Sequence, residues 1–261
     1  MDAPMLFDRH ARRLHRDRAS RAGGDAFVHA HAFDEVMERL DFVKRSFDRT
    51  LLLGCANPDW VERLGRIVGE VVVVDPSPAA AASAGGIAAD EDRLPFADEV
   101  FDLVISIGTL DGIDDLPGAL ILIRRVLRPD GLFLAAMAGA GSLPRLKAAM
   151  IAADAAGDRG TAPRMHPAVD VRTAGDLLAR AGFALPVADV DSLDVSYSAF
   201  LTLVSDVRAH GGGNVLARRS RVPLGRMALA AAQVDFARHA QSGRTIERAE
   251  ILHMSGWAPK P

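Results

Sequence analysis

Two unbroken apolar runs lie in the first half of the chain, at 51–53 and 71–74. The first consists of three leucines and ends at Gly54, and the second consists of four valines and ends at Asp75. Runs without polar alternation are typical of parallel strands buried on both faces of a sheet. Two such strands separated by a turn and a helix start, with an acid about 20 residues after the turn, predict a nucleotide-binding α/β sheet.

The alternation of strand and helix patterns continues to residue 138. It predicts a parallel sheet with right-handed crossovers, because parallel neighbours need a helix between them. The next elements are expected as a strand at 87–89, a strand at 101–106, a helix at 116–127 and a strand at 131–137.

Helical patterns dominate on either side of this region. Apolar residues at helical spacing predict helices at 5–22 and 25–46, which Gly23 and Gly24 separate. The remaining expected elements are, in order, a helix at 143–156, a loop at 157–166, a helix at 174–181 closed by Gly182, a strand at 187–195, helices at 197–209 and 224–240, and a strand at 246–255.

These elements predict an α/β fold with a Rossmann-like, seven-stranded, mostly parallel sheet. An N-terminal helical segment precedes the sheet, and a helical lid is inserted before the last strand. The expected organisation is N-terminal helices packing on the core at 1–47, a core at 48–195 and 245–261, and a lid at 196–244.

Composition narrows the class of protein. A chain of 261 residues with 49% hydrophobic and 25% charged residues is expected to be a soluble globular protein. The net charge of −3 argues against a general nucleic-acid binder. Cys55 is the one cysteine, so no internal disulfide forms and a reducing compartment fits. The sequence has no apolar run of about 18 residues, so we expect no transmembrane segment.

The first 21 residues are rich in arginine, as in an organelle transit peptide. Transit peptides avoid acids, whereas Asp2, Asp8 and Asp17 lie in this stretch, which favours a solvated helix of the mature protein. Only Lys44, Lys147 and Lys260 are lysines, a bias associated with GC-rich bacterial genomes. We therefore expect a bacterial, cytoplasmic protein.

The turn after the first strand is the first candidate binding element. Gly54 lets a ligand approach the backbone, and the next helix offers free N–H groups, with Asn57 expected as its N-cap and Pro58 at its first position. Asp75 at the end of the second strand is placed to accept both hydroxyls of a ribose. The alternative is that Asp75 caps a helix, because Pro76 follows it.

Two further groups are expected at the same edge of the sheet. The acids at 90–92 follow the short third strand, and a carboxylate there can accept a hydrogen bond from an adenine amino group, although three adjacent acids are also typical of a solvated loop. Ser106 and Ile107 end the fourth strand at this edge.

Three segments together resemble class I S-adenosylmethionine-dependent methyltransferases: VDPSP (74–78), DEDRLPFADEVFDLVIS (90–106) and LRPDGLFL (127–134). LFDRHARRLHRDRASR (6–21), ILHMSGWAPK (251–260) and two internal segments (163–191 and 205–219) resemble a narrower branch. That branch includes the complex I assembly factor, which is a protein-arginine hydroxylase, its bacterial relatives and, more distantly, the malonyl-carrier-protein methyltransferase of biotin synthesis.

The resemblance implies S-adenosylmethionine as cofactor, with S-adenosylhomocysteine as its product. The implied cofactor-binding residues are Gly54, Cys55, Asn57, Asp75, Pro76, Asp90, Glu91, Ser106 and Ile107. The chain departs from the family pattern where an acid in the first strand is Leu52, and where two further glycines are Ala56 and Pro58. Losing a charge partner for the ligand's ammonium group costs about 1.5–3 kcal/mol, so weak or altered cofactor binding is expected.

The leading hypothesis is an S-adenosylmethionine-binding enzyme that modifies a protein, by methylation or arginine hydroxylation, with a respiratory complex I subunit as the implied partner. One alternative is a non-catalytic assembly factor with a degraded cofactor site, and another is a methyltransferase for a small molecule or a carrier protein. The sequence identifies no catalytic base and no metal site, because the eight histidines are scattered and His29 and His31 diverge on a helix. A basic segment at 208–226 could contact an anionic partner or a membrane surface, or it could be a solvated loop.

Overall fold

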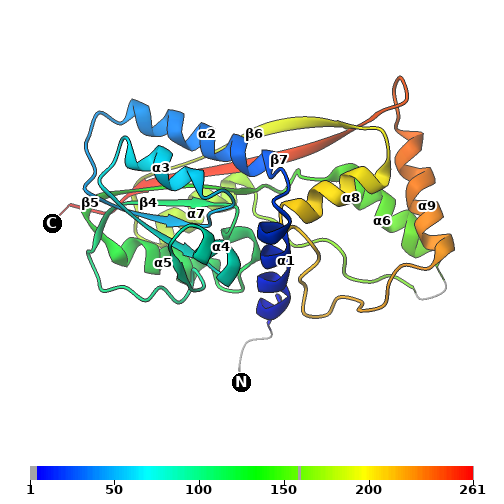
Figure 1. The fold of residues 1–261 in the computed structure, drawn as a ribbon, viewed down its shortest axis with the longest axis horizontal. Coiled ribbons are helices and arrows are strands. Elements are labelled where there is room, and N and C mark those ends of the chain that lie inside the picture. Colours follow the sequence, from blue (N-terminus) through cyan, green and yellow to red (C-terminus); the bar gives the residue numbers. More distant parts are fainter. Residues whose placement is uncertain (1–4, 158–159, 261) are drawn as a thin grey trace.

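A seven-stranded sheet forms the centre of the molecule in the computed structural model, which describes residues 5–157 and 160–260 (Figure 1). The strand order is β3-β2-β1-β4-β5-β7-β6, and β7 alone runs antiparallel to its neighbours. The predicted fold class is therefore confirmed. The strands are β1 (Arg49–Leu53), β2 (Glu70–Asp75), β3 (Ile87–Ala88), β4 (Phe101–Ile107), β5 (Leu127–Ala138), β6 (Ala184–Tyr197) and β7 (Thr245–Trp257).

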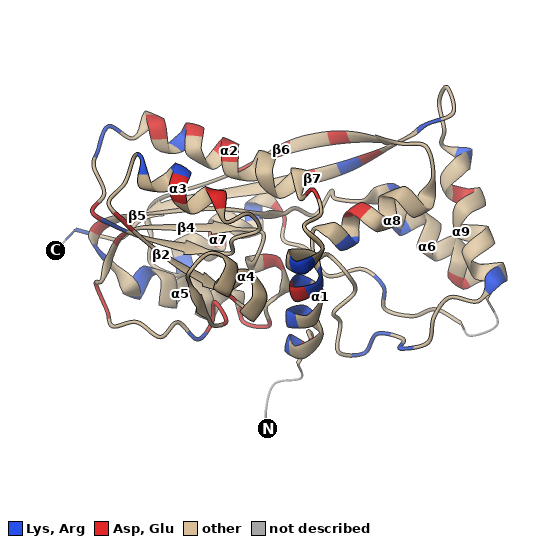
Figure 2. Cartoon of the chain, viewed as in Figure 1, with Lys and Arg blue, Asp and Glu red and all other residues tan. Residues whose placement is uncertain are grey.

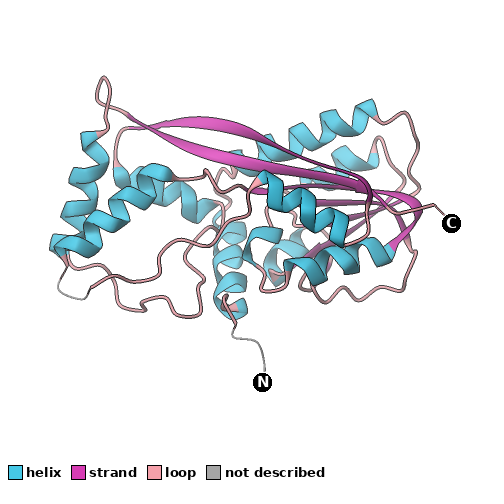
Figure 3. Ribbon diagram, turned by 180° about the vertical axis from the view of Figure 1, so that it is seen from behind, coloured by secondary structure: helices cyan, strands magenta, loops and turns pink. Residues whose placement is uncertain are grey.

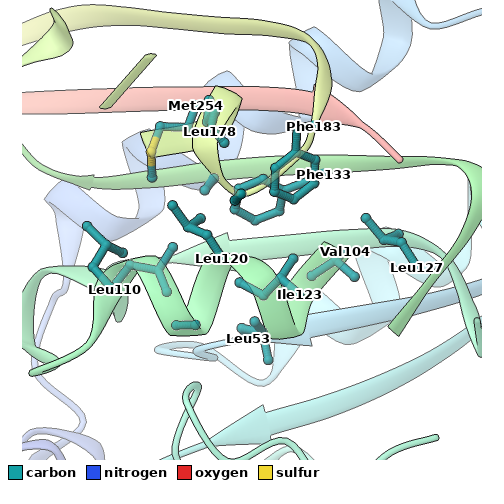
Figure 4. Close-up of a cluster of buried hydrophobic side chains, with 14 of the residues drawn as sticks. Leu53, Val104, Leu110, Leu120, Ile123, Leu127, Phe133, Leu178, Phe183 and Met254 are labelled. Atoms are coloured by element: carbon teal, nitrogen blue, oxygen red, sulfur yellow. The ribbon is translucent and has the colours of Figure 1, made fainter. Parts of the chain in front are cut away.

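Helices cover both faces of the sheet, as the uniformly apolar strands require (Figure 3). One face packs against α5 (Leu116–Val126) and α7 (Val171–Arg180), and Figure 4 shows this cluster around Leu120, Ile123 and Phe133. The other face packs against α2 (Phe27–Phe42) and α3 (Asp59–Gly65). Side chains of β1 point to the two faces in turn, so Leu51 and Leu53 belong to the cluster under α5, and Leu52 belongs to the cluster under α2.

A second group of helices lies beside the sheet rather than on it. Strands β6 and β7 continue past the other strands as a two-stranded ribbon, and the chain between them forms α8 (Phe200–Ala209) and α9 (Arg226–Arg238) (Figure 1). Helix α6 (Pro144–Ala156), which follows β5, packs on both the ribbon and α9. The predicted insertion at 196–244 thus contributes two of the three helices in this group.

Helix α1 (Arg9–Ala22) crosses the junction between the sheet and this helical group (Figure 1). It contacts α4 (Pro78–Ser83), which follows β2, and α8. Asp8 begins α1 because its carboxylate accepts a hydrogen bond from the Ala11 N–H. The helix therefore starts four residues later than the expected position 5, and positions 1–4 lie outside the described residues.

Two boundaries differ from the sequence predictions for local reasons. Pro58 occupies the N-cap position of α3 and the helix begins at Asp59, one residue later than expected, although the Asn57 Oδ1 atom does accept the Asp59 N–H at 2.9 Å. Strand β5 begins at Leu127 rather than at 131, because the register shifts and a residue with positive φ, Asp130, carries the chain on within the strand.

The predictions on membrane-spanning helices and on the 157–166 loop can be compared only with the described residues. No helix in 5–157 or 160–260 is both long and apolar enough to cross a membrane. The predicted loop at 157–166 includes residues 158–159, which lie outside the described residues, as does residue 261 of the predicted core.

Candidate cofactor edge

Parallel pairing brings the ends of β1, β2 and β4 to one edge of the sheet. Leu53 pairs with Val74 on one side and with Ser106 on the other, so the residues that follow each strand meet. Asp75 and Ser106 are fully buried, and Ile107 is almost fully buried. The carboxyl edge of a parallel sheet is where such folds bind ligands.

Gly54 makes the turn after β1 with a backbone conformation that disfavours other residues. Its φ is +82°, and a Cβ atom at this position would lie 2.2 Å from Thr109 Cγ2 and 2.5 Å from the Ile107 carbonyl oxygen. The glycine therefore allows this turn to pack against the end of β4. Cys55 follows and points its backbone N–H at the Asp75 carboxylate, 3.1 Å away.

The Asp75 carboxylate accepts four hydrogen bonds from the protein itself. Oδ1 accepts from Ser77 N at 2.8 Å and from Arg16 Nε at 3.1 Å, and Oδ2 accepts from Cys55 N at 3.1 Å and from an Arg16 guanidinium nitrogen at 2.6 Å. An ionised carboxylate has about four lone-pair sites, so this one is saturated. The helix-cap alternative for Asp75 is wrong, because Ser77 is the N-cap of α4 and its hydroxyl accepts the Ala80 N–H at 3.0 Å, whereas Asp75 accepts only the Ser77 N–H from this region.

The neighbouring acids also pair with arginines of α1. Both Glu91 oxygens accept from the Arg12 guanidinium, at 2.8 and 2.9 Å, in a bidentate ion pair that is almost fully buried. Asp90 Oδ2 accepts from Arg9 at 3.1 Å and from Arg13 at 2.6 Å. Asp90 Oδ1 is buried and has no hydrogen-bond partner among the described residues.

Helix α1 therefore lies along this edge of the sheet with four arginines directed at it, and Figure 2 shows the concentration of basic residues on this helix. Arg16 also donates to the Gly108 carbonyl at 3.0 Å. A cavity of about 50 Å³ remains beside Arg16, His29 and Cys55. Ligand pockets are usually about 300–1,000 Å³, so this cavity by itself is too small for a nucleoside.

Sequence reasoning missed the role of these arginines, because an arginine-rich amphipathic segment is more often a solvated surface. The available signal was their spacing: positions 9, 12, 13 and 16 fall on one face of a helix. The acids that they pair with are 59 to 83 residues away in the sequence. The partners therefore become visible only once the sheet has formed.

The other predicted residues take lesser roles at this edge. The Ser106 hydroxyl lies 3.1 Å from the Thr109 hydroxyl, and Pro76 is buried behind Asp75. Asn57 is exposed and serves the start of α3. Burial, together with Asp75, raises the pKa of the Cys55 thiol to about 12, so this thiol stays protonated and is a poor nucleophile.

Residues of the basic segment and the 157–166 loop have structural partners. Arg219 pairs with Asp8 at 3.0 Å, and His210 Nε2 accepts the Val28 N–H at 3.0 Å. His166 Nε2 accepts the Val215 N–H at 3.0 Å, and Asp170 caps α7. These contacts connect the helical insertion to α1, α2 and the loop.

The sheet order and the glycine turn, with an acid at the end of β2, define the fold of class I S-adenosylmethionine-dependent methyltransferases. Residues 51–135 match the family model described as a methyltransferase domain. The solved Burkholderia thailandensis 1,6-didemethyltoxoflavin-N1-methyltransferase is similar in fold, with a TM-score of 0.53, 17% identity, and coverage of 100% of this chain and 94% of that one.

Curated relatives give a narrower assignment. The zebrafish (Danio rerio) protein named arginine-hydroxylase NDUFAF5, mitochondrial, is 31% identical over 266 residues, which cover 97% of this chain and 83% of the relative. The malonyl-[acyl-carrier protein] O-methyltransferase of Laribacter hongkongensis is 32% identical over 173 residues, which cover 66% of this chain and 56% of that enzyme. The chain belongs to the NDUFAF5 family of methyltransferase-like proteins.

Proposed function

We propose that this chain is an S-adenosylmethionine-binding enzyme that modifies an arginine of a protein partner, as the name of its NDUFAF5 relatives describes. The respiratory complex I subunit that the sequence resemblance implies is the proposed partner. The match to these relatives extends over almost the whole chain, including α1 and the helical insertion. The match to the carrier-protein methyltransferase covers only two thirds of it, which favours the protein-modifying activity.

The observation that carries the proposal is the unpartnered Asp90 Oδ1 atom. A buried carboxylate oxygen without a hydrogen bond is costly, typically about 1–3 kcal/mol and more when charged. An adenine amino group is a donor of the required kind, and Asp90 lies after the third strand, where the family resemblance puts the adenine contact. The atom thus has the chemistry expected of a nucleoside contact.

The position of α1 sets a condition on this function. Because Asp75 is saturated while Arg16 is bound, the residues at this edge do not accept a ribose in the conformation described. We propose that α1 withdraws Arg16 when the cofactor binds, which leaves Asp75 with the Cys55 and Ser77 N–H groups and two free acceptor sites. This requirement adds to the weakened binding expected from Leu52.

The proposed function predicts a specific change in cells. For hydroxylation, the oxygen must come from dioxygen with an external two-electron reductant, because S-adenosylmethionine donates none. Deletion of the gene should then remove the mass of one oxygen atom from an arginine-containing peptide of a complex I subunit, as measured by mass spectrometry of the purified complex. A gene copy carrying Asp90→Asn should fail to restore the modification, whereas Asp98→Asn, which changes an exposed acid, should restore it. Immunoblotting confirms that both variants accumulate equally.

The alternative function, a non-catalytic assembly factor, is favoured by the saturation of Asp75. It predicts that deletion impairs complex I assembly, that no subunit changes in mass, and that Asp90→Asn restores assembly in full. Loss of a methylene mass instead of an oxygen mass would identify methyl transfer as the reaction.

A further inference from the structure

A second cluster of ligand-type side chains lies on the face of the sheet that α2 covers. His31 and Glu35 are four residues apart on α2, so they share one side of the helix. Asp191 lies on β6, and its carboxylate is 2.9 Å from His31 Nε2. One ligand atom from each of these three residues lies within 4.8 Å of the other two.

These separations suit a single metal ion. Ligand atoms about 2.1 Å from an ion lie roughly 3.0–3.4 Å apart when adjacent and about 4.2 Å apart when opposite. The His31–Asp191 separation of 2.9 Å is already close to the adjacent spacing, and the other ligand atoms have to move in from no more than 4.8 Å to close around an ion. His31 and Asp191 are both about one third to two fifths exposed, which leaves one side of the ion open to water or another molecule.

A buried histidine on the neighbouring strand provides an independent indication. His253 on β7 pairs with Asp189 in the ladder, two residues from Asp191 on the same strand, so its side chain is on the face that carries the cluster. It is only 1% exposed, and neither ring nitrogen has a hydrogen-bond partner among the described residues. Buried polar groups in folded proteins nearly always have a partner, and a metal ion is one such partner.

The charge of the cluster selects the kind of ion. Glu35 and Asp191 supply two negative charges to balance a dication, and the nearby Arg39 is already neutralised by a bidentate ion pair with Asp189. One imidazole with two carboxylates suits zinc, iron, manganese or cobalt, whereas calcium and magnesium prefer oxygen ligands alone.

We propose that His31, Glu35 and Asp191 bind a divalent first-row transition metal, on the same face of the sheet as the buried, unpartnered imidazole of His253. The site is formed by α2 and β6, apart from the arginines of α1 that hold the cofactor edge. It extends beyond the proposed function and does not depend on it. The sequence did not predict it because His31 and Asp191 are 160 residues apart.

Cobalt(II) alone is a suitable probe, because its d–d absorption reports nitrogen and oxygen coordination directly. The tag-free wild-type protein should bind one equivalent, seen as a saturable visible band and in isothermal titration. His31→Gln, Glu35→Gln and Asp191→Asn should each weaken binding by about tenfold or more. Glu38→Gln, which changes an exposed acid on the same helix, should bind as the wild type does.

Three results would overturn the proposal. The first is the absence of a saturable cobalt band in the wild-type protein at millimolar metal. The second is wild-type affinity in all three ligand variants, and the third is an equal loss in Glu38→Gln, which would show nonspecific binding to acids. Circular dichroism melts of the metal-free variants verify that each one is folded.

Discussion

Asp75→Asn is expected to lower the free energy of unfolding by about 3–5 kcal/mol. The wild-type carboxylate is fully buried and holds the Arg16 guanidinium through two hydrogen bonds. An asparagine is neutral and presents an amide NH₂ in place of one acceptor oxygen. Arg16 would then be a buried charge with two neutral acceptors, the amide oxygen of the new side chain and the Gly108 carbonyl, and no counter-charge from position 75. The same change removes the acceptor proposed for the ribose, so binding of S-adenosylhomocysteine should be lost.

Urea denaturation followed by tryptophan fluorescence measures this loss of stability, because Trp60 is buried against α2. The matched control is Asp98→Asn, which breaks an ion pair with Arg125 at a carboxylate that is 65% exposed. Surface ion pairs contribute about 0–1 kcal/mol, so the control should remain within about 1 kcal/mol of the wild type. A loss in Asp75→Asn no larger than the control's would show that the Arg16 pair is not a structural constraint.

Arg16→Ala is expected to tighten binding of S-adenosylhomocysteine by about tenfold or more. When the binding-competent state is a minor population, the apparent affinity falls by that fraction, and removal of the competing group restores it. Alanine leaves Asp75 with the N–H groups of Cys55 and Ser77, which still stabilise the charge. The variant should therefore lose less stability than Asp75→Asn while gaining affinity.

Calorimetric titration of the two proteins with S-adenosylhomocysteine measures the gain. Arg21→Ala is the control, because Arg21 lies on the same helix but is 73% exposed and pairs loosely with Asp17 at 3.8 Å. It should bind the ligand as the wild type does. Equal affinity of Arg16→Ala and the wild type would contradict the competition between α1 and the cofactor, while leaving the cofactor itself in place.

The fold followed from local signals that the structure did not override. Uniform β-branched and leucine runs became buried parallel strands, and turn residues such as Gly54 and Gly23 fell where the chain turns. Boundaries moved where side chains acted on the backbone: the Asp8 carboxylate begins α1, and Pro58 moves the start of α3 by one residue. These effects depend on geometry that a hydrophobicity pattern does not contain.

The candidate sites depend on contacts between distant segments, which a single sequence does not reveal. The edge of the sheet was predictable, since Asp75 and Ser106 must meet once their strands pair in parallel. The partner of Asp75 was not, because Arg16 lies on a helix whose docking depends on tertiary packing. The cluster of His31 and Asp191 has the same origin, since neither residue belongs to a local motif.

The departures from the family pattern in β1 and in the turn after it also have a structural context. Leu52 is fully buried in the cluster under α2, where an acid would be surrounded by apolar side chains. Gly54 keeps its turn because β4 packs against it. The turn is therefore an intact structural element. Whether the protein binds a cofactor as an enzyme or acts as a non-catalytic assembly factor then depends on whether Asp75 and Asp90 are free of the α1 arginines.

The central claim is that the edge formed by Asp75 and Asp90 takes the nucleoside of S-adenosylmethionine when α1 releases it. The most direct test is isothermal titration of the wild-type protein with S-adenosylhomocysteine, repeated with Asp90→Asn. We expect saturable binding at one site, weakened by the Asp90 substitution. No heat and no thermal shift at millimolar ligand, or equal binding by Asp90→Asn, would contradict it.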